Sequence, residues 1–495
     1  MESFNPAKLL ELLTYGPNSP LLFNSGLFLV LFLGFYTIYT FLSGKRTASI
    51  RLLYVTAFSY YFYYKNAGAY CCLLAVITLV NYFAAIAMEK QESRARKRVF
   101  LWGAVVFMVA QLAFFKYTNF FIQATDQLTG GSFAALDIFL PLGISFFTFQ
   151  SLSYIIDVYR GQMPACKSIL NFAFFVSFFP TILSGPILRA RTFLPQLKDN
   201  VVITREMFGT GLWYVITGLF KKAVISDYIG ENFVNRIFDN PSLYTGLENL
   251  IGLYGYALKL YCDFSGYSDI AIGIALWLGF HIPENFRAPY KSDSITDFWR
   301  RWHISLSSWL RDYLYISLGG NRKGNLRMYF NLFITMLLGG LWHGASWNFL
   351  VWGGVHGAAL GIHKKFRSLI GHDRHYHSQG WRKICAVVLT FHLICFCWLF
   401  FANSNFEAST VMLSKIFTDF HPELLTQFLA GYPAVTALIL SGFILHYLPE
   451  SLSVKARGMV TNSPMAAQVL YLVIIIFIVV QVRGSEVQPF IYLQF

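Results

Sequence analysis

Long apolar runs, separated by short polar and basic segments, recur along the chain from residue 21 to residue 482. A helix needs roughly 20 apolar residues to cross the hydrocarbon core of a bilayer, so most of these runs predict membrane helices. The predicted segments are 21–42, 50–64, 67–88, 99–122, 137–158, 206–220, 243–280, 326–342, 346–362, 384–402, 428–448 and 466–482. The pattern therefore predicts an all-α polytopic membrane protein with about 11 transmembrane helices.

Two further segments have different patterns. Residues 168–184 are apolar but end in Phe179-Pro180 and have basic residues on both sides, which indicates a re-entrant hairpin. Residues 297–315 place aromatic side chains on one helical face and polar ones on the other, so we expect one continuous amphipathic helix at the cytoplasmic interface. On that helix His303 falls at the rim of the apolar face.

The composition supports the membrane interpretation. Of the 495 residues, 56% are hydrophobic, 18% aromatic and 13% charged, which excludes a soluble enzyme and a disordered chain. The net charge of +14 is explained by basic loops on the cytoplasmic side, so we expect membrane lipids as partners and no nucleic acid. No soluble domain or repeat interrupts the pattern, and residues 1–495 are predicted to form one membrane domain.

Ionisable residues inside apolar runs are functional hypotheses because their burial costs several kcal/mol. The sharpest case is His343, in a run that contains three nearby glycines. Ser346 is a candidate N-cap for a helix that begins near Trp347, which predicts a break beside His343. His356 would lie about 20 Å further along a straight helix, too far to act on the same bond. The alternative for both histidines is simple packing.

A second candidate cluster occupies 261–274, where Asp263 and Asp269 flank Tyr267 among apolar residues. Two buried carboxylates need partners, and we expect these to be arginines of 297–311. The cluster is interpreted mainly as a structural clamp, with substrate binding or a proton relay as the alternative.

Other chemistries have little support. The chain has no G-x-S-x-G, no Walker A and no G-x-G-x-x-G motif. The loop 363–383 contains four histidines but no Cys or nearby Glu to complete a metal site, so no metal is expected. Those histidines are His363, His372, His375 and His377. Haem ligation is disfavoured because only the isolated His392 and His446 remain for it.

Several long motifs resemble a known family. The runs PENFRAPYKSDSITDFWRRWHISLSSWLRDYLYISLGGNRKG (283–324) and LLGGLWHGASWNFLVWGGVHG (337–357) are similar to the membrane-bound O-acyltransferase (MBOAT) superfamily. YCDFSGYSDIAIG (261–273) and PFIYLQF (489–495) are similar to its alginate O-acetylation (AlgI-type) branch, which is related to the D-alanyl transfer protein of teichoic acids. The core motifs cover 261–357, and similar stretches extend the resemblance across most of the chain.

The resemblance implies a fold and a site. The family fold is a ring of helices around a thin central region with a funnel. The invariant family histidine matches His343, and a second family position matches His303, 40 residues earlier. We add Trp342, His356 and the 261–274 residues Asp263, Tyr267 and Asp269 as candidates for a pocket or acceptor path.

Acyl transfer joins a thioester to a hydroxyl and needs a base for the hydroxyl proton, a role that suits neutral His343. His303 would position a reacting group or polarise the acyl carbonyl. We expect acetyl-CoA, or an acetylated acyl carrier protein, as a co-substrate and no tightly bound cofactor. Five basic residues are candidates for attracting the phosphates of the donor, with lipid-headgroup contact as the alternative. They are Lys291, Arg300, Arg301, Arg322 and Lys323.

In the AlgI-type branch the acceptor is implied to be an exported polysaccharide, and a separate periplasmic SGNH-type transferase commonly completes the transfer. The resemblance thus implies a multi-pass protein of the bacterial inner membrane that serves exopolysaccharide or cell-wall O-acetylation, alginate biosynthesis included. Two alternatives remain: D-alanyl or other acyl transfer, and a non-catalytic transporter whose pathway is lined by Asp263, Asp269 and His343.

Overall fold

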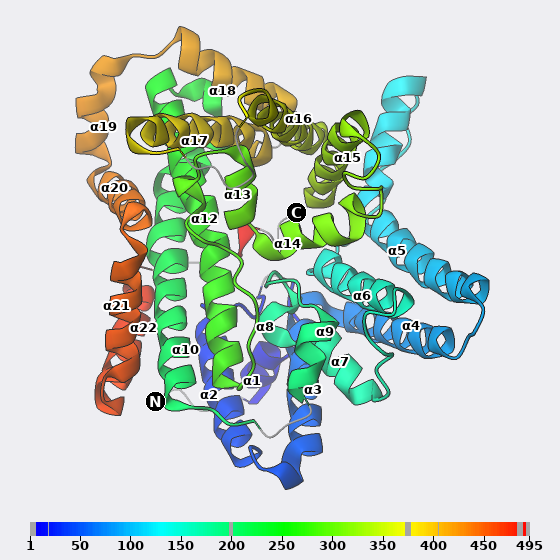
Figure 1. Ribbon diagram of the computed structural model, residues 1–495. Helices are drawn as coiled ribbons and strands as arrows, with labels where there is room; N and C mark the ends of the chain where they lie inside the picture. Colours follow the sequence, from blue (N-terminus) through cyan, green and yellow to red (C-terminus); the bar gives the residue numbers. More distant parts are fainter. Residues whose placement is uncertain are drawn as a thin grey trace. The chain divides into compact units, whose positions relative to one another are not determined.

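The computed structural model describes residues 6–17, 19–197, 201–371, 378–403, 405–482 and 489–491. Every regular element within these ranges is a helix and none is a strand (Figure 1), which confirms the all-α expectation. The chain divides into two compact units. The first contains Met1–Gly211 and Ile270–Pro283, and the second contains Leu212–Asp269 and Glu284–Ile491. The expectation of one domain over 1–495 stays a prediction.

The first unit contains the N-terminal helices, which follow the predicted apolar runs closely. They are α1 (Pro6–Leu13), α2 (Gly26–Phe41), α3 (Ala48–Ala67), α4 (Cys71–Glu89), α5 (Arg94–Thr129), α6 (Ile144–Tyr159), α7 (Ile169–Ser177), α8 (Phe179–Ile182), α9 (Ala190–Phe193) and the start of α10 (Arg205–Leu219). Short 3₁₀ turns join some of them: η1 (Lys45–Thr47), η2 (Gly68–Tyr70) and η3 (Leu194–Leu197).

The segment 168–184, predicted to be re-entrant, is two short helices. Helix α7 ends at Ser177, Phe178 leaves helical geometry, and α8 begins at Phe179 with Pro180 in its first turn. The residues around the break are buried within the unit. Broken backbone at membrane depth is tolerated where protein covers it, so this geometry suits the expected role. A return to the same side of a membrane stays a prediction.

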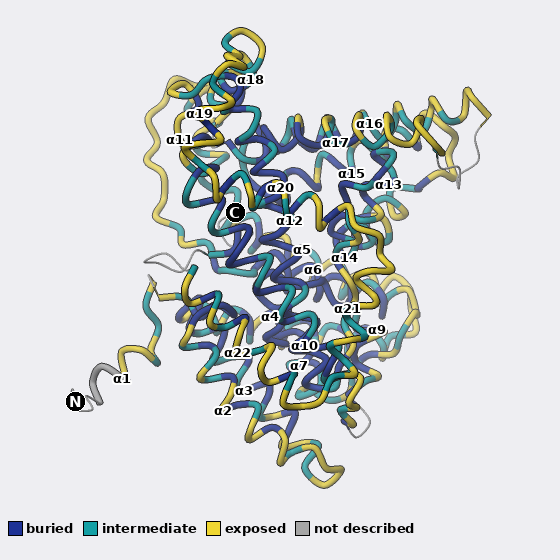
Figure 2. The backbone as a smooth tube through the Cα atoms, turned by 90° about the vertical axis from the view of Figure 1, so that its left-hand side faces the viewer, coloured by how far each residue is buried: buried dark blue, intermediate teal, exposed yellow. Residues whose placement is uncertain are grey.

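The second unit contains most of the remaining helices. They are α11 (Asn235–Asp239), α12 (Gly246–Trp277, up to Asp269), α13 (Ile295–Arg301), α14 (Ile304–Trp309), α15 (Asn325–His343), α16 (Trp347–Leu369), α17 (Gly380–Ala402), α18 (Phe406–Thr418), α19 (Leu425–Gly431), α20 (Pro433–Tyr447), α21 (Glu450–Asn462) and α22 (Met465–Val482). Wide π-helical turns and 3₁₀ turns complete it: η4 (Phe220–Asp227), η5 (Gly230–Val234), η6 (Pro241–Leu243), η7 (Pro289–Lys291), η8 (Leu310–Tyr315) and η9 (Pro422–Leu424). Much of α12 is buried (Figure 2).

Membrane-spanning character is clearest in four stretches of the described chain. Lys45–Glu89, Arg94–Thr129, Gly380–Ala402 and Met465–Val482 are long and apolar enough to cross a bilayer. The pair Pro422–Gly431 and Pro433–Tyr447 adds a fifth if it forms one broken span. These helices support a membrane protein, and the total of about 11 spans stays a prediction.

The membrane segment predicted over 428–448 is not one continuous helix. The structure has two helices there, bent by 102° between Gly431 and Pro433. Pro433 has no amide hydrogen and its ring clashes with the preceding turn, so the helix cannot continue through it. Tyr432 accordingly leaves helical geometry, with φ −126° and ψ 52°.

Candidate active site

His343 is the last residue of α15, and the chain breaks directly after it. Gly344 is extended, Ser346 occupies the N-cap position, and α16 begins at Trp347. The predicted break beside His343 is therefore confirmed. The Ser346 side chain, however, makes no capping hydrogen bond.

Glycines allow α16 to pack back against α15 at backbone distance. A Cβ atom added at Gly340 would lie 2.2 Å from the carbonyl oxygen of Phe349, and one at Gly353 would lie 2.5 Å from that of Met336. The two helices therefore form a tight pair that no larger residue at these positions would permit.

This return corrects the expectation that His356 lies too far away to share a site. The indole of Trp352 lies 5.0 Å from the His343 ring and 4.6 Å from the His356 ring, between centroids. The straight-helix distance does not apply because the helix breaks and reverses. Trp299 Nε1–H donates to Nδ1 of His356 at 3.3 Å, so a neutral His356 carries its proton on Nε2.

Aromatic rings surround His343. Besides Trp352, its ring lies 4.8 Å from Trp342, 5.1 Å from Phe401 and 6.4 Å from Phe349, between centroids. The histidine is 3% exposed. Its position is thus set by close packing from α15, α16 and α17.

His303 lies at a second helix break. The single amphipathic helix expected over 297–315 is wrong: α13 ends at Arg301, α14 starts at Ile304, and the π-helical turn η8 follows from Leu310. His303 between them has φ 43° and ψ 56°, a left-handed conformation that is strained for a residue with a side chain. The break turns His303 inward, and it is fully buried instead of lying at a rim.

A hydrogen bond and a ring contact hold the His303 side chain in place. Its Nδ1 lies 3.1 Å from Oδ1 of Asn285, and the Phe264 ring packs edge-on at 4.6 Å between centroids. Burial lowers the pKa of His303 to about 3, so the imidazole is neutral at cellular pH.

The two predicted histidines meet at Trp342. Its indole lies 6.1 Å from the His303 ring and 4.8 Å from the His343 ring, between centroids. Residues 40 positions apart therefore share one neighbour, and the structure brings His303, Trp342 and His343 together. We call His303, Trp342, His343, Trp352 and His356 the imidazole–indole cluster.

The partners expected for the acidic pair are wrong. Asp263 accepts from Lys222 Nζ at 2.7 Å, and its second oxygen accepts from the backbone N–H of Ile491 at 2.8 Å. Lys222 Nζ also pairs with Asp227 at 2.8 Å. Asp269 pairs with Lys221 at 2.6 Å. Two of the arginines expected to pair with them engage local carboxylates instead, as Arg301–Asp297 and Arg311–Asp312.

These contacts make a buried ion clamp between η4 and α12. The lysines were missed by the sequence analysis, although Lys221 and Lys222 interrupt an apolar run and so signal a need for buried acidic partners. Tyr267, on the same helix as Asp263, packs against Phe490 at 4.8 Å between ring centroids. The clamp thus holds residues 489–491, in agreement with the structural interpretation.

The five basic residues proposed for donor binding differ in their surroundings. Lys291 donates to the carbonyl of Leu448 at 2.6 Å, and Arg301 is engaged by Asp297. Arg300, Arg322 and Lys323 are exposed. In the histidine-rich loop, His363 Nδ1 lies 2.9 Å from Thr296 Oγ1, and His372, His375 and His377 fall outside the described residues.

Comparison with known proteins places these features in a family. Residues 165–406 match the model of the membrane-bound O-acyltransferase family. This range includes the imidazole–indole cluster. A probable alginate O-acetylase AlgI of Pseudomonas putida is 36% identical over 96% of this chain and 100% of its own length. The chain belongs to the membrane-bound O-acyltransferase family and is a membrane-associated O-acyltransferase.

Two further relatives differ in the acceptor that their names state. A peptidoglycan O-acetyltransferase of Helicobacter pylori is 36% identical over 79% of this chain and 79% of its own length. A teichoic acid D-alanyltransferase of Bacillus subtilis is 32% identical over 54% of this chain and 69% of its own length. The family is therefore shared by enzymes with different acyl groups and acceptors.

Proposed function

We propose that this protein is an O-acetyltransferase of the bacterial inner membrane that moves an acetyl group from a cytoplasmic thioester toward an exported polysaccharide. One observation carries the proposal: His303 and His343, from separate helix breaks, lie against the same indole of Trp342. The names of the similar proteins, alginate O-acetylase and peptidoglycan O-acetyltransferase, support acetyl transfer to a glycan.

The chemistry assigned to the site is a proton-coupled acyl transfer. The acceptor oxygen attacks the carbonyl carbon of the thioester, a new C–O bond forms, and the C–S bond breaks. His343 takes the hydroxyl proton and returns it to the departing thiolate, which leaves as a thiol. A neutral imidazole is needed for the first half of this step.

Donor and acceptor are proposed to approach from opposite sides of the membrane. Acetyl-CoA or an acetylated carrier protein serves as the donor, drawn by the exposed Arg300, Arg322 and Lys323. The acetyl group then passes to a separate periplasmic transferase of the SGNH type. About 11 membrane helices around a central funnel would provide the two paths.

The test is acetyl transfer by the purified full-length protein from radiolabelled acetyl-CoA. His343→Ala is expected to lower release of free CoA by about 100-fold or more, the usual contribution of general base catalysis. His392→Ala is the matched control, because His392 contacts Tyr254 and lies outside the imidazole–indole cluster.

Three outcomes would contradict the proposal in different ways. Full activity in His343→Ala would remove the assigned base. Wild-type protein that binds acetyl-CoA but releases no CoA would favour a transporter. Transfer of D-alanine in place of acetate would move the protein toward the activity named for the teichoic acid relative.

A further inference from the structure

The orientation of the Asn285 side chain is determined by a backbone donor. The N–H of Ser305 lies 3.1 Å from Oδ1 of Asn285. A backbone N–H can only donate, so the side-chain atom that faces it must be the amide oxygen. The amide nitrogen then donates to Ser268 Oγ at 3.3 Å. Asn285 is 1% exposed, so its amide is held by protein groups.

The same oxygen defines the tautomer of His303. Oδ1 also accepts from Ser305 Oγ at 2.9 Å and faces Nδ1 of His303 at 3.1 Å. Because a carbonyl oxygen only accepts, Nδ1 of His303 must carry the hydrogen. A neutral imidazole has one N–H, so Nε2 carries the lone pair.

Asn285 also supports the strained backbone at this position. Its carbonyl oxygen accepts from the N–H of Ile304 at 2.9 Å, directly after the left-handed His303. One asparagine thus binds the His303 ring and the two residues that follow it, Ile304 and Ser305. A left-handed conformation of a residue with a side chain persists only where its surroundings hold it.

We infer that Asn285 is a positioning residue that makes Nε2 of His303 a hydrogen-bond acceptor. His303 therefore contacts the hydroxyl-bearing substrate that receives the acyl group, and not the thioester donor. The inference rests on the proposed function. A thioester offers only hydrogen-bond acceptors, its carbonyl oxygen and its sulfur, so it cannot donate to Nε2. A hydroxyl can.

The sequence analysis considered two roles for His303, positioning a reacting group and polarising the acyl carbonyl. This assignment keeps the first role and excludes the second. Polarising the acyl carbonyl needs an N–H that points at the carbonyl oxygen, which is the opposite tautomer. An acceptor that carries a second hydroxyl can donate it to His303 while the reacting hydroxyl gives its proton to His343. His303 then orients the acceptor, and no covalent bond to it forms or breaks.

The first experiment compares Asn285→Ala with Asn285→Asp in the full-length protein. Asn285→Ala removes the acceptor of Nδ1–H, and kcat is expected to fall at least about tenfold while the KM for acetyl-CoA is unchanged. Ser268→Ala is the matched control: it removes only the partner of the amide nitrogen and should change kcat less than Asn285→Ala.

Asn285→Asp keeps an oxygen at the same place and adds a negative charge beside His303. The charge favours the imidazolium form, so activity should be retained at high pH and its acid limb should shift upward. If Asn285 served only to hold the fold, the carboxylate would change stability and leave the acid limb where it is in the wild type.

A spectroscopic readout tests the tautomer without turnover. In protein labelled with ¹⁵N-histidine, the signals lost in His303→Gln should show a protonated Nδ1 and an unprotonated Nε2. Asn285→Ala should disturb that signature.

The two proposals fail separately. Active wild-type protein with a protonated Nε2, or Asn285→Ala with unchanged kcat, would overturn this inference alone. Wild-type protein with the expected ring signature and no acetyl transfer from any thioester would overturn the proposed function, and with it the acceptor-side role.

Discussion

His303 and His343 lie against the same indole but are held by different forces. His303 is oriented by the amide of Asn285 at a strained left-handed position, whereas His343 is packed between aromatic rings at the end of a regular helix. A hydrogen bond selects one tautomer and one ring orientation. Ring packing restricts the position of the His343 side chain.

The difference suggests a division of labour. An imidazole that only orients a partner benefits from a fixed direction. The proposals above accordingly assign positioning to His303 and proton transfer to His343.

Removal of the shared indole should have the largest effect on both sides of the comparison. Trp342 is buried, and Trp342→Ala is expected to lower the free energy of unfolding by about 3 to 5 kcal/mol through lost burial and a cavity. Thermal unfolding in detergent measures the loss of stability, and an acetyl-transfer assay measures the loss of activity. Trp381→Ala is the control, because Trp381 is 71% exposed. Wild-type stability and activity in Trp342→Ala would show that the indole does not connect the two histidines.

A change at the helix pair should affect His343 first. Gly340→Ala would force a Cβ against the Phe349 carbonyl and is expected to cost about 1 to 3 kcal/mol of stability. Gly361→Ala on the same helix pair meets only Tyr329 at 3.8 Å, so it should be neutral or gain up to about 1 kcal/mol. Equal unfolding temperatures for the two variants would contradict the close backbone packing.

A smaller change should affect His303 first. Ser305→Ala removes one hydrogen bond to Asn285 and is expected to cost about 1 kcal/mol, with a smaller loss of kcat than Asn285→Ala. The control is Ser308→Ala, because the Ser308 hydroxyl bonds only its own helix, at the Ser305 carbonyl. If the control lost as much activity as Ser305→Ala, the hydrogen bond to Asn285 would not be the cause.

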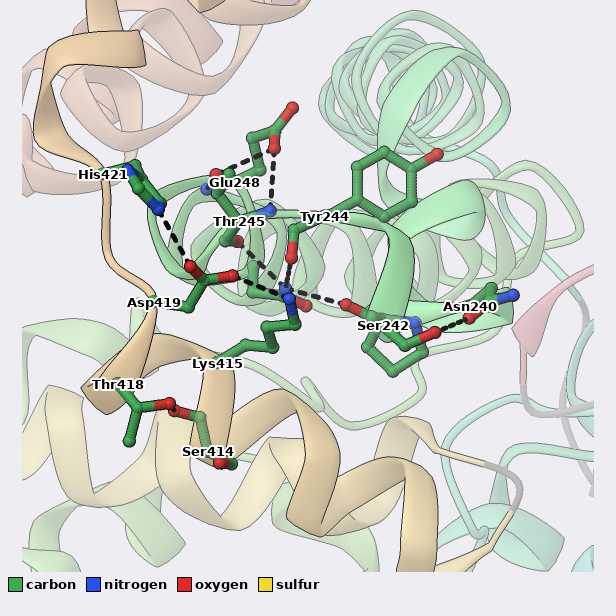
Figure 3. Close-up of polar contacts among 12 residues, drawn as sticks. Asn240, Ser242, Tyr244, Thr245, Glu248, Ser414, Lys415, Thr418, Asp419 and His421 are labelled. Atoms are coloured by element: carbon green, nitrogen blue, oxygen red, sulfur yellow. Dashed lines mark hydrogen bonds and ion pairs between the residues drawn. The ribbon is translucent and has the colours of Figure 1, made fainter.

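The smallest effect is expected at His421, an exposed histidine that contrasts with the buried pair. Its Nδ1 lies 2.7 Å from Oε1 of Glu423. Its Nε2 lies 2.9 Å from Oδ1 of Asp419, and Asp419 also pairs with Lys415 (Figure 3). The hydrogen bonds to Glu423 and Asp419 raise the pKa of His421 above its usual 6.5.

The sign of the pH dependence follows from that shift. A histidine whose pKa is raised in the folded state stabilises the protein when it is protonated. This stabilisation is complete below about pH 6.5 and is lost as the pH rises through the raised pKa. The difference in unfolding temperature between wild type and His421→Gln should therefore be present at pH 6 and disappear in alkaline buffer. A difference independent of pH would show that charge on His421 plays no part.

Much of the fold follows from local sequence pattern. Apolar runs predict nearly every long helix, because burial of a helix in apolar surroundings depends mainly on its own composition. The break after His343 is also local, since glycine and a candidate N-cap residue mark it. Two errors have different causes. Gly431 and Pro433 give a strong local signal that the hydrophobic pattern alone does not use, whereas no glycine or proline marks the break at His303.

The sequence by itself determined the membrane class, the helical runs, the family motifs and the two histidines as candidates. Only the tertiary structure decided that Lys221 and Lys222 pair with Asp269 and Asp263, that His356 and His343 contact the same indole of Trp352, and that Asn285 orients His303. The physical reason is the distance along the chain over which each interaction acts. Hydrophobic pattern and chain breaks act over a few residues, whereas the partner of a buried charge or imidazole can come from any segment that folding brings near it.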